Sequence, residues 1–159
     1  MINPERNINS SHELSYFGKT MAVGDFDGDG IEEVFVGAPG YSLTGLGQVG
    51  AIYLVSMDAK DNITNELLGE PFALGPDPYS RFGYSLVKID VNRDGIDDLV
   101  VSAPAHGKGG ATDIGDYYPK DYNGRLYVYL GQKGVGLSTS PAFELRTNRL
   151  EDDFFFNMG

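Results

Sequence analysis

The chain repeats itself at a fixed offset, and this repeat constrains its fold more than any other feature. The stretch YFGKTMAVGDFDGDGIEEVFVGAPG begins at Tyr16, and RFGYSLVKIDVNRDGIDDLVVSAPA begins 65 residues later at Arg81. The two stretches align without a gap over 25 positions. Each copy carries a Phe-Gly pair near its start and a short small-residue segment ending in Ala-Pro. Agreement over such a length indicates two copies of one structural unit.

Each copy predicts four short strands, expected in the first copy at about 20–24, 33–37, 50–56 and 67–74. The runs VFVG and LVVS are continuously apolar, as expected of a strand with both faces covered. The 22 glycines and 8 prolines indicate frequent tight turns, and no segment predicts a helix of consequence. Recurring four-stranded units predict an all-β fold built of β-propeller blades, whereas a β-sandwich predicts no such repetition.

The repeat divides the chain into four parts. We expect a polar N-terminal segment over 1–13, a first repeat over 14–76 and a second repeat over 77–152. The second repeat carries a polar, glycine-rich loop insertion near 106–123. The final residues, 153–159, resemble the start of a truncated third repeat. Two blades cannot close a ring, so the chain is expected to need further blades from a parent chain or from other copies.

Both copies contain an acidic loop between their first two strands, at 25–33 and 90–98. Alternate positions 1, 3 and 5 carry oxygen ligands, glycine follows at position 6, position 7 can offer a backbone carbonyl, and position 9 is acidic. Calcium prefers six to eight such hard oxygen ligands, and the glycine permits the sharp turn. We therefore predict two Ca²⁺ sites, made by Asp25, Asp27, Asp29, Ile31 and Glu33 and by Asp90, Asn92, Asp94, Ile96 and Asp98.

Other interpretations of the loops are less consistent with the sequence. An EF-hand needs a bidentate Glu at position 12 and flanking helices, but Val36 and Val101 stand there between β-like runs. A plain acidic hairpin turn remains an alternative, although two matched loops in register weaken it. Magnesium prefers a stricter octahedral shell with several waters, and zinc would need Cys or clustered His.

Composition excludes several functions. A net charge of −11 argues against nucleic acid as a partner and against docking on anionic lipid. No stretch approaches the length of a transmembrane span, and the absence of Cys excludes thiolate chemistry. His12 and His106 lie in polar loops and are expected to face solvent. The tyrosines near 117–122 are expected to pack over a blade edge, with a recognition loop as the alternative. The Phe154–Phe156 run is expected to form the entry of the next blade. We expect no catalytic residue in this segment.

With its Phe-Gly and Gly-Ala-Pro motifs and its acidic loops, the sequence resembles the FG-GAP repeat family over residues 14–159. That family includes the integrin α-subunit head and the C-terminal region of glycosylphosphatidylinositol (GPI)-specific phospholipase D. The phrase YVYLGQKGVGLSTSP, from Tyr127 onward, is more similar to the phospholipase region. The resemblance implies a calcium-binding β-propeller, usually of seven blades, in an extracellular or secreted protein.

The resemblance also implies partners. In the phospholipase, a separate zinc domain carries catalysis, so this chain would be a non-catalytic accessory region whose partners are the remaining blades or a catalytic domain of the parent chain. The alternative is an integrin-α-like adhesion or ligand-binding module, with a protein or glycan ligand at the propeller loops.

Overall fold

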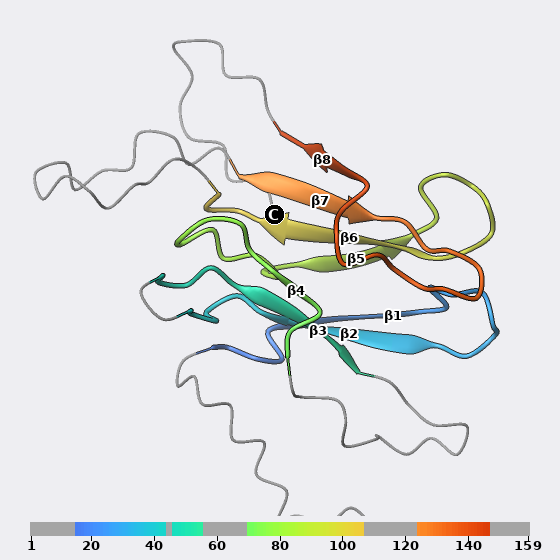
Figure 1. Ribbon diagram of the computed structural model, residues 1–159, viewed down its shortest axis with the longest axis horizontal. Coiled ribbons are helices and arrows are strands. Elements are labelled where there is room, and N and C mark those ends of the chain that lie inside the picture. The colour runs from blue at the N-terminus through green and yellow to red at the C-terminus, as the bar shows by residue number, and fades with distance from the viewer. Residues whose placement is uncertain (1–14, 44–45, 56–69, 107–123, 147–159) are drawn as a thin grey trace, which may run out of the picture.

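The computed structural model describes residues 15–43, 46–55, 70–106 and 124–146, and these residues form eight strands and no helix. They form two four-stranded antiparallel sheets, each in chain order (Figure 1). The first sheet contains β1 (Thr20–Gly24), β2 (Glu33–Ala38), β3 (Ala51–Val55) and β4 (Ala73–Leu74). The second contains β5 (Leu86–Ile89), β6 (Asp98–Ala103), β7 (Arg125–Tyr129) and β8 (Phe143–Leu145). The predicted all-β architecture of four-stranded propeller blades is confirmed; we call the sheets blade 1 and blade 2.

The strand bounds in blade 1 differ slightly from the prediction. β1 occupies the expected residues, and β2 runs one residue further, to Ala38. β3 begins after Gly50, whose φ of 81° takes it out of the strand conformation. β4 is shorter than expected, because residues 70–72 are not in a strand, and 67–69 lie outside the described residues.

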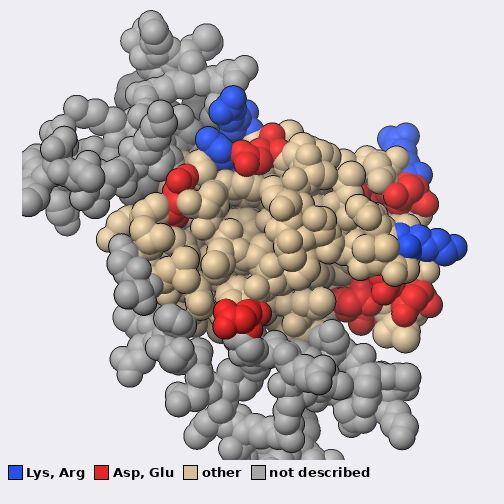
Figure 2. Space-filling model, in the orientation of Figure 1, with Lys and Arg blue, Asp and Glu red and all other residues tan. Residues whose placement is uncertain are grey.

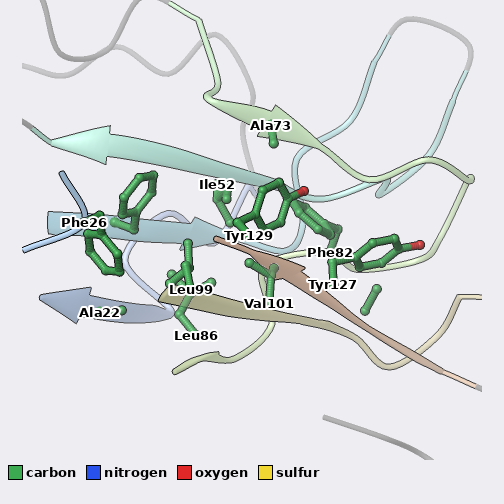
Figure 3. Close-up of a cluster of buried hydrophobic side chains, with 12 residues drawn as sticks. Ala22, Phe26, Ile52, Ala73, Phe82, Leu86, Leu99, Val101, Tyr127 and Tyr129 are labelled. Atoms are coloured by element: carbon green, nitrogen blue, oxygen red, sulfur yellow. The ribbon is translucent and has the colours of Figure 1, made fainter. Parts of the chain in front are cut away.

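The two blades face each other across one hydrophobic core. Paired residues of neighbouring strands lie on the same side of a sheet, so the rows that start at Ala22 in β1 and at Leu86 in β5 both point to this core. Figure 3 shows these side chains meeting between the sheets. The buried cluster consists of Ala22, Phe26, Phe35, Ile52, Ala73, Phe82, Leu86, Leu99, Val101, Ala103, Tyr127 and Tyr129. The core therefore joins the two repeats.

Phe82 of the second Phe-Gly pair lies at the centre of this junction. Its ring centroid lies 5.4 Å from that of Tyr127 and 6.5 Å from that of Tyr129, in edge-to-face geometry. Only 1% of the residue is exposed. Its backbone N–H donates to the carbonyl of Val49 in blade 1 at 3.2 Å. The Phe-Gly motif thus links its own blade to the preceding one.

Glycine allows the backbones of the two blades to approach closely. A Cβ added to Gly37 would lie 2.2 Å from the carbonyl oxygen of Gly83, and one added to Gly50 would lie 2.2 Å from that of Phe82. No real Cβ tolerates such distances, so a larger residue would force the blades apart. Gly37, in the Gly-Ala-Pro motif of the first repeat, therefore allows the close contact between the blades.

The connections are segregated between the two ends of the sheets. The β1–β2 and β5–β6 turns, which carry the acidic loops, lie at one end (Figure 1). The Phe-Gly turns and the β2–β3 connection begin at the other end, because the strands alternate in direction. Among the described residues, no helix is long and apolar enough to cross a membrane.

Candidate metal-binding loops

The β1–β2 turn gathers three carboxylates at one point. Asp25, Asp27 and Asp29 each offer one oxygen, and these oxygens lie within 4.8 Å of one another. Figure 2 shows acidic side chains concentrated at the end of the molecule where the β1–β2 and β5–β6 turns lie. The spacing brings them together because the chain between Asp25 and Gly30 curls back on itself, with positive φ at Gly28 and Gly30.

Hydrogen bonds from the loop backbone fix these carboxylates. The Asp29 N–H donates to Asp25 Oδ1 at 3.1 Å and to Asp27 Oδ1 at 3.0 Å. The Gly30 N–H donates to Asp25 Oδ2 at 3.0 Å, and the Ile31 N–H donates to Asp29 Oδ1 at 2.7 Å. The acidic side chains are thereby turned inward over the loop instead of extending into solvent.

The β5–β6 turn has the same pattern. The Asp94 N–H donates to Asp90 Oδ1 at 3.2 Å and to Asn92 Oδ1 at 3.0 Å. The Gly95 N–H donates to Asp90 Oδ2 at 3.0 Å, and the Ile96 N–H donates to Asp94 Oδ1 at 2.9 Å. The loops differ at position 3, where the Asn92 amide donates to Asp94 Oδ2 at 2.8 Å. The two loops are therefore equivalent in geometry, and the second has one carboxylate fewer at positions 1, 3, 5 and 9.

The acidic residues at position 9 close the loops through the backbone. Glu33 Oε2 accepts the N–H of Phe26 at 2.9 Å, and Asp98 Oδ2 accepts the N–H of Val91 at 2.7 Å. Asp98 is fully buried, and its other oxygen accepts the N–H of Gly131 at 2.8 Å. Neither position-9 residue belongs to a carboxylate cluster of the kind found at 25, 27 and 29. Their role in this structure is to join the two ends of each loop.

Negative charge is crowded in the first loop. The pKa of Glu33 is raised, chiefly by partial burial and further by the charges of Asp27, Asp25 and Asp29, while the Phe26 N–H opposes the rise. Like charges this close are unfavourable unless a cation offsets them. The loop therefore gathers oxygen ligands in a place that attracts positive charge.

Residues of the second repeat hydrogen-bond to the backbone of the first loop. The Asp97 N–H donates to the carbonyl of Asp25 at 3.1 Å, and the Asp25 N–H donates to Asp97 Oδ2 at 3.0 Å. The N–H groups of Gln132 and Gly134 donate to the carbonyls of Phe26 and Asp27 at 3.2 and 2.6 Å. Sequence reasoning missed these residues, because their partners lie more than 70 residues away in the chain.

This contact makes the first loop less exposed than the second. Asp27 is half-buried beneath the segment that follows β7, where a Cβ added to Gly136 would lie 3.8 Å from the Cβ of Asp27. Asn92, the equivalent residue, is exposed. The difference follows from position in the array, since only the first loop has a succeeding blade against it among the described residues.

The donor chemistry of both loops suits a hard divalent cation. Each loop offers side-chain oxygens at positions 1, 3 and 5, close enough in the first loop to meet at one centre, and neither brings a His or Cys. Calcium takes six to eight oxygen ligands in flexible geometry, and carbonyl oxygens and waters commonly complete its shell. The residues present therefore fit calcium.

Comparison with known proteins bears on the two-blade fold and its loops. The FG-GAP repeat profile matches residues 17–55 and 82–129, which together contain both Phe-Gly pairs and both acidic loops. The chain belongs to the FG-GAP repeat family.

Its relatives fall into two groups. Phosphatidylinositol-glycan-specific phospholipase D of Mus musculus is 36% identical over 149 residues, covering 86% of this chain and 17% of the relative. Integrin alpha-PS2 of Drosophila melanogaster is 36% identical over 135 residues, covering 80% of this chain and 8% of that protein. Human integrin alpha-IIb is 35% identical over 135 residues, covering 80% of this chain and 11% of that protein. The chain thus spans less than a fifth of the length of these FG-GAP relatives.

The expectation that His106 faces solvent is wrong. Only 5% of His106 is exposed, and its Nδ1 lies 3.0 Å from the Tyr127 hydroxyl and 3.1 Å from Asp77 Oδ2. With a proton on Nδ1 the ring can donate to Asp77, and without one it can accept from Tyr127. The residue follows β6 and turns under the sheet, where polar neighbours replace water. His12, the tyrosines near 117–122 and Phe154–Phe156 lie outside the described residues.

The burial of His106 predicts a pH effect. Burial and the charge of Arg125 lower its pKa below the usual 6.5, against the opposing effects of Asp77 and Glu144. Protonation of His106 is therefore less favourable in the folded state than in the unfolded state. The stability contributed by the neutral ring is complete at pH values above the unfolded-state pKa. It is lost as the pH falls from there through the lower folded-state pKa. Urea unfolding at pH 7.5 and 5.5 should show a loss of stability that His106→Gln reduces. An equal loss in the variant would assign the effect to other groups.

Proposed function

We propose that this chain is a calcium-binding segment of an FG-GAP β-propeller, with one Ca²⁺ in each acidic loop. The ligands would be the side chains at positions 1, 3, 5 and 9 and the carbonyl at position 7. In the first loop these are Asp25, Asp27, Asp29, Ile31 and Glu33. In the second they are Asp90, Asn92, Asp94, Ile96 and Asp98. The observation that carries the proposal is the identical hydrogen-bond pattern of two loops made of oxygen donors, 65 residues apart.

The proposed role of the metal is structural. Each loop joins the first two strands of its blade, and the first also contacts the neighbouring blade through its backbone. A cation would offset the charge crowding that raises the pKa of Glu33. The cation would thereby hold the hairpin in the conformation that contacts blade 2, and it would take part in no reaction.

Calcium titration of single-site variants tests this proposal. Isothermal titration calorimetry of the unaltered chain should give two sites. Asp25→Asn and Asp90→Asn should each remove or severely weaken one site, because position 1 supplies a charged ligand and accepts the N–H groups that shape the loop. Glu70→Gln, a matched loss of one negative charge at an exposed residue outside the loops, should leave both sites intact. A chain that takes up no calcium, or variants indistinguishable from Glu70→Gln, would refute the proposal.

We further propose that the two repeats, assigned to 14–76 and 77–152 with the start of a third at 153–159, belong with additional blades. The support is apolar surface on the faces turned away from the shared core. In blade 1, Met21 and Val23 are 64% and 43% exposed. In blade 2, a cross-strand row runs from Val87 to Phe143, and these two ends are 52% and 40% exposed. Such surface is suited to burial against a neighbouring blade.

The parent is proposed to be an extracellular protein like the phospholipase D relatives, with this segment as its non-catalytic accessory region. Similarity over 86% of the chain to the mouse protein supports this role. The alternative, an integrin-α-like adhesion module, is supported by similarity over 80% of the chain to integrin alpha-PS2. The parental sequence discriminates between them, since a His- and Asp-rich zinc domain upstream would support the first and a transmembrane helix downstream would support the second.

A further inference from the structure

A hollow lies between the blades at the end opposite to the acidic loops. It has a volume of about 240 Å³ and lies beside the Phe-Gly turns of both repeats and the β2–β3 connection. Its lining includes two cationic side chains, Lys19 and Arg81, two tyrosines, Tyr16 and Tyr84, and Gln48. The hollow is formed by both blades, so each contributes to whatever it binds.

The two cations in this hollow are not neutralised within the described part of the chain. Neither Lys19 nor Arg81 lies within ion-pair distance of a carboxylate there, whereas Lys88 pairs with Asp97 at 3.1 Å and Arg125 contacts Glu144 at 2.6 Å. The Lys19 ammonium instead lies 5.2 Å from the centroid of the Tyr84 ring. In a chain with a net charge of −11, two unpaired cations around one hollow form a local site of opposite charge.

The repeat explains how the four side chains come together. Tyr16 and Arg81 are equivalent positions, as are Lys19 and Tyr84, so each blade supplies one cation and one tyrosine in opposite order. Tyr16 and Arg81 occupy the same turn conformation, with φ of 53° and 54°. The exchange of residue types places a cation of one blade over the aromatic ring of the next. The turn that builds the blade contact thus also fixes the positions of the charged groups.

We propose that this hollow binds an oxyanion, a carboxylate or phosphate, carried on a ligand of about the size of one sugar ring. The volume is below the roughly 300 to 1,000 Å³ of pockets for drug-sized ligands, which limits the occupant to a small group. Arg81 can offer a forked pair of N–H donors to an oxyanion, and Lys19 a compact positive charge. The tyrosine rings provide flat surfaces and hydroxyl groups for the uncharged part of the ligand.

Titration with defined small anions tests the site. The probes are glucose 6-phosphate and glucuronate, with glucose as the neutral comparison, added to the whole chain at constant ionic strength. Amide chemical shifts of Gly40 and Gln48, which line the hollow, should move with one or both anions and remain unchanged with glucose. A response to only one anion would identify phosphate or carboxylate as the preferred group.

Variants then locate the interaction. Arg81→Gln and Lys19→Gln should each weaken binding about tenfold, the loss expected for a charge-assisted hydrogen bond. Lys133→Gln removes the same charge at the end that carries the acidic loops and should bind like the unaltered chain. Tyr84→Leu removes the ring beneath Lys19 and should weaken binding as well. Absence of any shift, an equal response to glucose, or equal weakening by Lys133→Gln would overturn the proposal.

Discussion

Calcium should raise the melting temperature of this chain by roughly 10 to 20 °C over its value in EDTA, if both proposed sites fill. At 100 times its dissociation constant, each bound ion adds about 2.7 kcal/mol to the free energy of unfolding. For a chain of this size, each kcal/mol shifts the melting temperature by about 2 to 4 °C. The gain arises because the carboxylates of Asp25, Asp27 and Asp29 are held close together in the folded state, and the second loop repeats their pattern of backbone hydrogen bonds.

Thermal denaturation monitored by circular dichroism in EDTA, in calcium and in magnesium would measure this effect. Magnesium should stabilise the chain less, because it favours octahedral geometry and retains its waters. The double variant Asp25→Asn, Asp90→Asn should melt at the same temperature with and without calcium. If the unaltered chain melts identically in EDTA and in millimolar calcium, the proposed stabilising role is wrong.

Replacing Phe82 with Ala should destabilise the chain by about 3 to 5 kcal/mol, the usual loss for a fully buried phenylalanine. The side chain lies between the blades and contacts Tyr127 and Tyr129, so its removal leaves a cavity at the junction. Urea unfolding in saturating calcium would measure the change separately from metal binding. The effect should appear as a lower denaturation midpoint of the whole chain.

Phe17→Ala is the matched control, because Phe17 is the equivalent residue of the first repeat. It is 37% exposed and contacts the Tyr53 ring at a centroid distance of 5.3 Å. Its replacement should cause a clearly smaller loss of stability, since less buried surface is removed. Equal losses from the two substitutions would show that the burial of Phe82 between the blades does not determine its contribution.

The sequence predicted the features that repeat and that depend on local chain geometry. The spacing of Asp25 and Asp90 from the following glycines, together with the flanking apolar runs, was sufficient to predict two strand-connecting loops of one kind. The structure has hairpins at both places, with β1 at the predicted residues. Periodicity succeeds here because side chains alternate along a strand and each turn is closed by residues near it in the chain.

The sequence could not predict contacts between residues that lie far apart in the chain. Asp97 hydrogen-bonds to Asp25 across 72 positions, and His106 is buried against Tyr127 and Asp77 although its neighbours in sequence are polar. The offset of the repeat shows which positions are equivalent, but it does not show which surface of one blade faces the next. The pairing of Lys19 with Tyr84 also depends on that packing, so the sequence alone does not predict the hollow between the blades.

Hydrogen bonds join the two blades at both ends of the sheets. At one end, the backbone of Asp25 is joined to Asp97, and at the other, Ser80 Oγ donates to the Val49 carbonyl at 2.7 Å. Among the described residues, opening the junction at either end would break hydrogen bonds between the blades. We therefore expect the two blades to move and unfold as one cooperative unit, so that a substitution at either end destabilises the whole junction.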